Sequence, residues 1–491
     1  MSRQHIVKSV FWLTAAEIIF NISGYIVHSA VGRILGPADY GRYGLVVTLT
    51  TMVIVLVGNG IPTAMSKYLS EFFETRPDMV GIIKRQSLVL QTIIISGLTL
   101  IFFALAPLIS RALGDPSLTP LFRISSLIIP AFAAASFYFY YFTGIHQFNI
   151  QAILKTVRSL AKVIFIIGLA YFFKTEGAIA GYIAAPFLVF IIALGIDKLS
   201  FRKNIRIRDN SPKISYYSQL LNYAWPLTLF MLFYEIMISI DLYMVKALLH
   251  NDYLTGIYNG ALTVGRIPYY LFYALAIVLL PTISKTTSRN NSKETKKAVS
   301  QSLRSMLILL PPVIILMSVF SAPIIKLFYG YSYSDAAFPM SILAVGVGFL
   351  TVFYIMSFAV NGAGKVKVPM FTALFGAALN IFLNYFLIKN YALAGAAIAT
   401  SLSSLAVMVV MLFFIKKYFK VLVSFKTLLK VMPAAFTIYL ISSFFLKTEN
   451  LIFIIWALII LAIYFIILYI LREIKKEDVQ LLKKLISKKI K

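Results

Sequence analysis

Residues 451–471 read LIFIIWALIILAIYFIILYIL, an uninterrupted apolar and aromatic run that carries no charge. A helix needs about 20 such residues to cross the hydrocarbon core of a bilayer, so this run is long enough to span a membrane. The rest of the chain has the same character, because 60% of its 491 residues are hydrophobic and only 13% are charged. Soluble domains carry about 25% charged residues. The composition therefore excludes a soluble globular, disordered or collagen-like protein, and the absence of Cys excludes a disulfide-stapled module.

Thirteen further apolar stretches of similar length accompany this run, and together they predict fourteen membrane spans. The predicted spans cover residues 8–32, 42–66, 86–110, 122–144, 153–173, 177–196, 217–246, 254–280, 303–327, 337–361, 368–388, 391–415, 427–446 and 451–471.

The net charge of +28 is distributed unevenly along the chain. Of the 46 Lys and Arg residues, 34 fall in the N-terminus, the C-terminal tail and the even-numbered connections between spans. Cytoplasmic loops are the loops enriched in Lys and Arg. We therefore expect a protein of the cell (cytoplasmic) membrane with both termini in the cytoplasm. Topology accounts for the positive charge, and a nucleic-acid partner is not needed.

Five short motifs recur at spacings of about 213–219 residues, for example Pro62-Thr63 at Pro281-Thr282. They predict two parallel copies of one six-span unit, which is the architecture of an alternating-access transporter. The expected fold is an all-α polytopic membrane protein whose final two spans lie outside the repeat. We expect an N-lobe over residues 1–196, a cytoplasmic linker over 197–216, a C-lobe over 217–416, two extra spans within 417–472, and a tail over 473–491 that is a basic amphipathic helix or, equally, a solvated segment.

Three groups of residues resemble those of a known family. The connection between the first two spans, residues 32–43, reads GRILGPADYGRY, and residues 256–259 read GIYN. These motifs, with the third group, resemble the polysaccharide-biosynthesis flippases, whose superfamily also contains lipid II flippases and multidrug extruders. The resemblance implies two six-helix lobes, and it implies that the last two spans line a groove for a polyprenyl tail. The third group comprises Gly364, Lys365, Pro369, Asn380, Asn384 and the run from Gly395 to Thr400.

Four basic residues are candidates for binding substrate inside the membrane. Lys155, Arg158 and Lys162 recur at i, i+3 and i+7 on one face of the fifth span. Arg266 lies near the middle of the eighth span and resembles the cavity arginine of lipid II flippases. Because a charge in the bilayer costs roughly 2.5–3.5 kcal/mol, each of them needs a partner. We expect them to bind the pyrophosphate of a lipid-linked substrate; the alternatives are snorkelling to the interface or pairing with Glu17, Glu235 or Asp241.

Polar residues on the first and seventh spans complete the predicted substrate site. Glu17, Asn21 and His28 share one face of the first span, and Glu235 lies on the seventh. We expect them to line the cleft, with Glu17 as a proton or substrate partner, unless they only bridge neighbouring helices. Asp39 with Arg33 and Arg42 marks the outer end of the first two spans, as a gate ion pair or as solvated loop charges.

Asp241, Asn380, Asn384 and Thr400 form a candidate cation site. A carboxylate, two amide oxygens and a hydroxyl are the oxygen ligands that a hard cation prefers. The resemblance to lipid II flippases implies a sodium ion between helices 7, 11 and 12. Asn384 stands where that pattern often has Asp, so the site carries one negative charge fewer; the alternative is an Asn ladder between helices. No cofactor is expected, only coupling to Na⁺ or H⁺.

The leading functional hypothesis is a flippase that moves a polyprenyl-(pyro)phosphate-linked oligosaccharide to the outer leaflet. Its expected partners are that substrate, membrane lipids and a glycan polymerase or ligase, and the expected state is a monomer. The alternatives are a multidrug or organic-cation antiporter and a lipid II flippase; the latter is disfavoured because spans 1 and 2 lack the arginines that lipid II flippases carry there. An enzyme is not expected, because the odd-numbered connections are short and no nucleophile–base pair or phosphate-binding loop is present.

Overall fold

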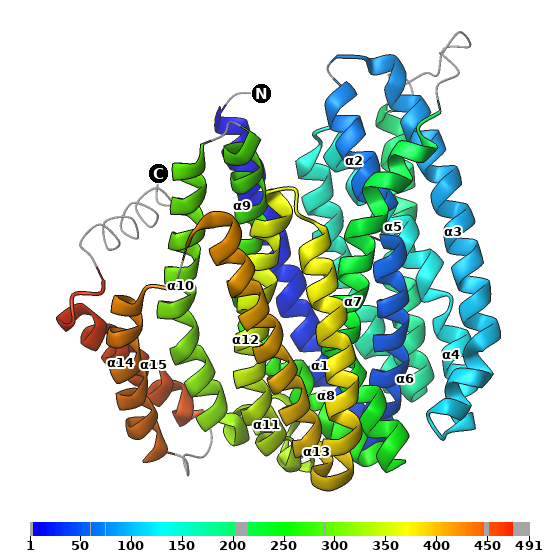
Figure 1. The fold of residues 1–491 in the computed structure, drawn as a ribbon. Coiled ribbons are helices and arrows are strands. Elements are labelled where there is room, and N and C mark those ends of the chain that lie inside the picture. The colour runs from blue at the N-terminus through cyan, green and yellow to red at the C-terminus, as the bar shows by residue number, and fades with distance from the viewer. Residues whose placement is uncertain are drawn as a thin grey trace. The chain divides into compact units, whose positions relative to one another are not determined.

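The computed structural model describes residues 3–58, 60–73, 75–201, 215–288, 291–421, 423–445 and 451–474. Over these residues every regular element is helical, as the sequence predicts (Figure 1). Residues 202–214 of the predicted linker and residues 475–491 of the predicted tail lie outside the described residues. The helices are α1 (Arg3–Gly58), α2 (Ile61–Phe72), α3 (Pro77–Ala112), α4 (Thr119–Ser125), α5 (Ile128–Gly144), α6 (Phe148–Ile196), α7 (Tyr217–Leu249), α8 (Asp252–Gly265), α9 (Ile267–Ser288), α10 (Ser292–Val319), α11 (Ser321–Tyr329), α12 (Ala337–Gly362), α13 (Lys367–Phe419), α14 (Phe425–Ser443) and α15 (Ile452–Ile470), with short helical turns η1 (Pro116–Leu118), η2 (Asp197–Phe201) and η3 (Tyr331–Ala336).

Ten helices in the described part of the chain are long and apolar enough to cross a membrane. Three of them, α1, α6 and α13, contain 56, 49 and 53 residues. A straight helix of that size would be about 75 Å long, more than twice the roughly 30 Å of a bilayer core. Each of the three leaves helical geometry near its middle. The breaks in α1 and α6 fall at predicted connections between two spans, and the break in α13, at Ala392, falls two residues after the predicted connection 389–390. The predicted eighth span is two helices, α8 and α9, that are separated at Arg266.

The break in α1 illustrates how the sequence sets these turns. Gly36 has a φ of +73°, in the left-handed region that glycine adopts without a Cβ clash. Pro37 follows directly, and its fixed φ is suited to the first turn of the next helical segment. The Gly-Pro pair therefore ends one span and starts the next.

Left-handed backbone recurs along the chain at the spacing of the sequence motifs. Of the ten described residues with a positive φ, eight form four pairs that are 214–218 residues apart. A positive φ is strained for residues other than glycine, so these positions are not chosen by local preference alone. A positive φ thus occurs at matching places of the two predicted repeats. The pairs are Gly36 with His250, Gly114 with Gly330, His146 with Gly364, and Lys174 with Ala392.

The chain forms two compact units. Unit 1 comprises Met1–Gly260 and Ala373–Leu393, and unit 2 comprises Ala261–Thr372 and Ala394–Lys491. In unit 1, α6 packs against α1 and α5, and α2 packs against α5. Its buried core is rich in aromatic side chains such as Tyr141 and Phe142. The predicted lobes have other boundaries and stay a prediction.

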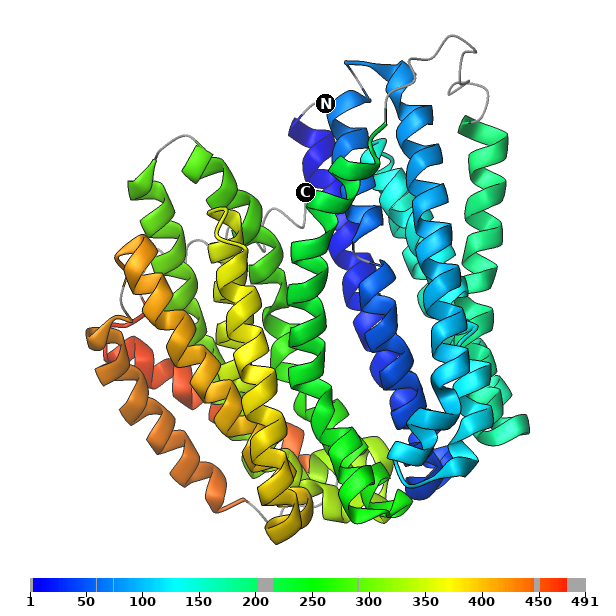
Figure 2. The same ribbon diagram turned by 45° about the vertical axis from the view of Figure 1, so that its right-hand side comes forward.

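Unit 2 is held together around α12, which packs against α9 and α10 (Figure 2). The last two helices, α14 and α15, lie together, and α14 packs on α10 (Figure 1). Their shared core contains Ile438, Ile460 and Tyr464. The Glu473 carboxylate accepts hydrogen bonds from Arg304 of α10 at 3.1 Å and from Thr427 of α14 at 2.9 Å. Two of the helices that lie outside the repeat are therefore anchored to α10.

Candidate functional site

Three cations of α6 converge on one aromatic ring of α1. The side-chain nitrogens of Lys155 and Lys162 each lie 5.4 Å from the centre of the Phe20 ring, and the Arg158 guanidinium lies 5.2 Å from it. The i, i+3, i+7 spacing places the three on one stripe of α6, as predicted, and α6 packs along α1. We call Glu17, Phe20, Lys155, Arg158 and Lys162 the basic cluster.

Only one of the three cations is neutralised. Lys155 forms an ion pair with Glu17, one of the acidic partners considered from the sequence. Within the described chain neither Arg158 nor Lys162 forms an ion pair. Aromatic faces surround them instead: the Arg158 guanidinium lies 4.2 Å from the centre of the Phe132 ring, and Lys162 lies 5.4 Å from that of Tyr182. The basic cluster thus has a net charge of +2.

This arrangement suits an anion with two or more charges. Arg158 is only 8% exposed, so its charge acts in a medium of low dielectric constant where an anion is attracted strongly. A guanidinium can donate two parallel hydrogen bonds to phosphate oxygens, and an ammonium adds further donors. Aromatic rings stabilise the cations without neutralising them. The cluster can therefore hold a phosphate or pyrophosphate group.

A second polar cluster joins α7, α8 and the first half of α13. The buried Asp241 carboxylate accepts a hydrogen bond from the Tyr258 hydroxyl at 2.7 Å and from the backbone N–H of Leu242 at 2.9 Å. Asn380 donates to the Met237 carbonyl at 2.6 Å, one helical turn before Asp241. The structure thus brings two of the predicted cation ligands to the same stretch of α7.

Asn384 supplies the free oxygen of this second cluster. Its side-chain amide donates to the Asn380 carbonyl at 2.9 Å and to the Asn380 side-chain oxygen. Its own Oδ1 is buried, and no donor of the described residues reaches it. A buried acceptor without a donor costs free energy unless a ligand satisfies it, and oxygen is the atom a hard cation seeks. These residues fit a small cation. We call Asp241, Tyr258, Asn380 and Asn384 the carboxamide cluster.

The two family motifs meet at a close backbone contact in unit 1. A Cβ on Gly256 would lie 1.7 Å from the Pro37 carbonyl oxygen, and one on Gly41 would lie 2.6 Å from the Asp252 carbonyl oxygen. Only glycine permits this approach between α1 and α8. Asn259 lies over the same contact and donates to the Tyr40 carbonyl at 3.4 Å. The motif residues are thus explained by packing of α8 on α1.

Next to this contact lies an ion-pair network that centres on a buried lysine. Lys246 is 3% exposed; it bonds to the Asp115 carboxylate at 3.0 Å and also to that of Asp252. Burial alone would raise the pKa of Asp115, but hydrogen bonds from Ser117 and Lys246 outweigh burial and hold this pKa below its ordinary value. Arg42 donates to the Ser117 hydroxyl at 2.9 Å and lies 3.9 Å from Asp39. The Asp39–Arg42 pair is thus half-buried, whereas the lysine of the Lys246 pairs is fully buried.

The remaining predicted residues are placed as follows. Asn21 is half-buried on α1, while His28 forms a 3.0 Å hydrogen bond with the Tyr40 hydroxyl. Glu235 is half-buried on α7 of unit 1. Arg266 and Thr400 belong to unit 2, where Arg266 is half-buried and Thr400 is 3% exposed. Their roles in substrate or cation binding stay predictions, as does the role of Arg33.

Sequence reasoning missed the groups that complete these clusters. Phe20, Phe132 and Tyr182 surround the cations, but an aromatic residue in an apolar helix gives no distinct signal. Tyr258 was visible within the GIYN motif, and only contact with Asp241 gives its hydroxyl a role. Lys246 has the sequence pattern of a loop charge, and nothing in the sequence distinguishes it from the single basic residues of the other odd-numbered connections.

Comparison with known proteins shows the family. The model for "Polysaccharide biosynthesis protein" matches residues 6–287, more than half of the chain, and the MatE model matches residues 220–386. The chain is 24% identical to an uncharacterized membrane protein of Methanocaldococcus jannaschii over 83% of this chain and 97% of that one. It is 23% identical to the lipid II flippase MurJ of Bacillus subtilis over 87% and 86% of the two chains. It is 26% identical to the probable low-salt glycan biosynthesis flippase Agl15 of Haloferax volcanii over 44% of each chain.

Solved structures give the fold. The lipid II flippase MurJ in an inward closed conformation superposes with a TM-score of 0.74 at 19% identity, covering 94% of this chain and 99% of that chain. An inward-facing MATE family transporter superposes with a TM-score of 0.69 at 15% identity, covering 84% and 98%. The family match, the flippases among its relatives and the helices long enough to span a membrane identify a multi-pass membrane translocator, and the chain belongs to the polysaccharide biosynthesis protein family.

Proposed function

We propose that this protein is a flippase for a polyprenyl-(pyro)phosphate-linked oligosaccharide. It would move the lipid-linked glycan from the cytoplasmic to the outer leaflet, for assembly of a cell-surface polysaccharide or glycoprotein. The observation that carries the proposal is the net charge of +2 in the basic cluster, where three cations surround Phe20 and one acid, Glu17, neutralises only Lys155. A charge inside a bilayer costs roughly 2.5–3.5 kcal/mol, so two unbalanced cations imply an anionic ligand.

The proposed mechanism is alternating access by two six-helix lobes, residues 1–196 and 217–416, with fourteen spans in total. The four pairs of left-handed residues at a spacing of 214–218 support the repeat. Arg158 and Lys162 would hold the phosphate groups while the lobes rock, and Arg266 would join them. Both termini would be cytoplasmic. An inside-negative membrane potential would assist outward movement of the anionic headgroup by about 2.3 kcal/mol per charge per 100 mV.

The carboxamide cluster is the proposed coupling site. Asp241 and the free Oδ1 of Asn384 would bind Na⁺, with Thr400 as a further ligand, and a gradient of that ion would reset the empty transporter. Agl15 is described as a glycan biosynthesis flippase and MurJ as a lipid II flippase, so relatives of both kinds support an anionic lipid-linked substrate. The match to the MatE model favours a drug antiporter as the second candidate.

A reconstitution experiment distinguishes these functions. Proteoliposomes would be loaded with a fluorescent polyprenyl-pyrophosphate oligosaccharide, lipid II or an organic cation, and outward movement of each would be measured. We expect movement of the oligosaccharide-lipid, its loss in Arg158→Gln, and no change in Arg123→Gln, a control at an exposed arginine. Movement of the organic cation alone would overturn the proposal, and movement of lipid II alone would reassign the substrate.

A further inference from the structure

A second basic site lies in unit 2, apart from every residue that the proposed mechanism uses. A pocket of about 650 Å³ opens where three segments meet: the end of α9 with the start of α10, the turn between α12 and α13, and the end of α13. Its size is in the range of small-molecule binding sites. Each segment belongs to a connection that the distribution of Lys and Arg predicts to be cytoplasmic. The lining residues are Thr287, Asn291, Ser292, Lys293, Thr295, Lys296, Ala363, Lys365, Tyr418, Phe419 and Lys420.

Four lysines line this pocket, and no acidic side chain of the described residues does. Lys293 and Lys296 come from α10, Lys365 from the α12–α13 turn and Lys420 from the end of α13. All four are exposed, and none forms an ion pair with a described residue. Four like charges around one cavity repel one another, so an anion in the cavity is favoured by all of them together.

The backbone adds donors and fixes the position of two of the lysines. The first N–H groups of α10 lack partners within the helix, as at every helix start; the Asn291 side chain caps only that of Glu294, at 3.2 Å. Lys420 ends α13 with a φ of +52°, and Gly364 turns the chain before Lys365 with a φ of +76°. These left-handed residues end α12 and α13 at the pocket and bring Lys365 and Lys420 to its wall.

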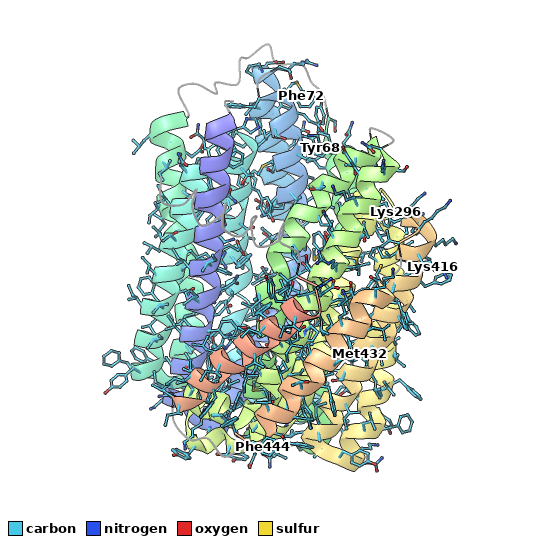
Figure 3. The ribbon with its side chains drawn as sticks, turned by 90° about the vertical axis from the view of Figure 1, so that its left-hand side faces the viewer. Tyr68, Phe72, Lys296, Lys416, Met432 and Phe444 are labelled. Carbon is cyan, nitrogen blue, oxygen red and sulfur yellow. The ribbon has the colours of Figure 1, made fainter. Side chains whose placement is uncertain are left out.

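Basic residues are common at this end of unit 2, so the pocket has to be distinguished from the general charge. Figure 3 shows Lys296 and Lys416 at the same end of the unit, with Phe444 at the opposite end. Lys297, Lys367, Lys416 and Lys417 are exposed residues of the same three segments, but they do not line the pocket. They carry the same charge without the cavity and so provide a matched control.

We propose that the pocket between α10, α12 and α13 is a binding site for phosphate groups, separate from the transport site. The phosphate would come from the headgroup of an anionic lipid of the inner leaflet or from a soluble polyphosphate. A phosphate group bound in the pocket would contact lysines of all three segments and so connect the α12–α13 turn and the end of α13 to the start of α10. The site depends only on unit 2, so its test is independent of the flippase proposal.

The test compares two fourfold variants of the full chain. The pocket variant is Lys293→Gln, Lys296→Gln, Lys365→Gln and Lys420→Gln, and the control variant is Lys297→Gln, Lys367→Gln, Lys416→Gln and Lys417→Gln. One arm measures binding of inorganic pyrophosphate to detergent-solubilised protein, with Arg158→Gln added to the natural chain and to both variants so that the basic cluster does not contribute. The other measures retention of phosphatidylglycerol after reconstitution into phosphatidylcholine vesicles with phosphatidylglycerol. Thermal unfolding in detergent checks that both variants are folded.

We expect the pocket variant to bind at least about 10-fold more weakly in one or both arms, because it loses four positive charges that act together on one anion. The control variant should bind like the natural chain. A loss confined to one arm identifies the source of the phosphate. Equal losses in both variants, or no binding by the natural chain in either arm, would overturn the proposal. If the pocket variant unfolds, Lys365→Gln against Lys367→Gln gives the same comparison with one charge.

Discussion

The two polar clusters of unit 1 occupy equivalent helices of the predicted repeat and have opposite chemistry. The basic cluster joins predicted spans 1 and 5, and the carboxamide cluster joins spans 7 and 11. Lys162 and Asn380 are 218 residues apart, the same separation as the left-handed residues Lys174 and Ala392. The basic cluster has three cations and one acid; the carboxamide cluster has one acid and two amides.

This difference shows how two copies of one helix pair can suit two different ions. The two copies occupy equivalent positions of the predicted repeat, but their charged side chains differ. A cluster with more cations than acids attracts phosphate, and the carboxylate and amide oxygens of the carboxamide cluster attract a cation. Each cluster is costly when empty, so the effect of a substitution depends on whether the ligand is present.

The largest effect on transport is expected when a cation of the basic cluster is replaced by the residue found at the matching position of the carboxamide cluster. Lys162→Asn places in α6 the residue that α13 has at the matching position. A hydrogen bond to a charged group contributes about 1.5–3 kcal/mol, so translocation of the oligosaccharide-lipid should fall roughly 10- to 100-fold. The melting temperature should stay constant or rise, because a cation without an acidic partner is removed. A lower melting temperature with normal transport per folded molecule would assign Lys162 a structural role instead.

The next largest effect is expected when a second carboxylate is added to the carboxamide cluster. Asn384→Asp adds a second carboxylate to the carboxamide cluster, which is costly without a counter-ion and favourable with one. The melting temperature should fall in choline chloride and recover in sodium chloride, with sodium affinity about 10-fold higher than in the natural chain. Asn390→Asp, at an exposed position of α13, is the control. If sodium and choline act alike on Asn384→Asp, the cluster does not bind sodium.

A smaller effect is expected from Glu17→Gln, which increases the imbalance of the basic cluster. Lys155 loses its carboxylate partner and is free to bind an anion. Because solvent-accessible ion pairs contribute roughly 0.2–1 kcal/mol, pyrophosphate should bind up to about 5-fold more tightly. Competition between pyrophosphate and the lipid-linked substrate measures this, with Glu71→Gln as an exposed control. Weaker binding in Glu17→Gln would show that Glu17 orients Lys155 toward the ligand.

The smallest effect concerns the Glu473 carboxylate, which forms ion pairs with Arg304 and Lys430 and serves as the reference. Burial alone would raise the pKa of Glu473, but hydrogen bonds from Arg304, Thr427 and Lys430 hold it below its ordinary value of 4.5. Because the folded-state pKa is lowered, this carboxylate stabilises the fold fully above pH 4.5 and loses that contribution as pH falls through the folded-state value. The unfolding temperature of the natural chain should therefore drop in acid. In Glu473→Gln that drop should be smaller, and an unchanged drop would contradict this origin.

Much of the fold can be predicted from local features of the sequence. Apolar length predicted the helices, and the Gly36-Pro37 pair marked a turn that α1 makes. The i, i+3, i+7 spacing predicted that Lys155, Arg158 and Lys162 share a face, because helical periodicity is a local property. The pairing of Asn380 with α7 was foreseen only through resemblance, since 143 residues separate it from Met237.

The sequence by itself determined the class of the protein: a membrane-spanning, all-helical translocator with cations in its spans. Composition and periodicity suffice for this because the bilayer acts on every residue of a span in the same way. Tertiary structure decided which charges are balanced. Glu17 pairs with Lys155 and leaves Arg158 and Lys162 to aromatic rings, and Lys246 is buried between two carboxylates. Such partners come from distant helices, so only packing determines which charges meet and which stay open for a ligand.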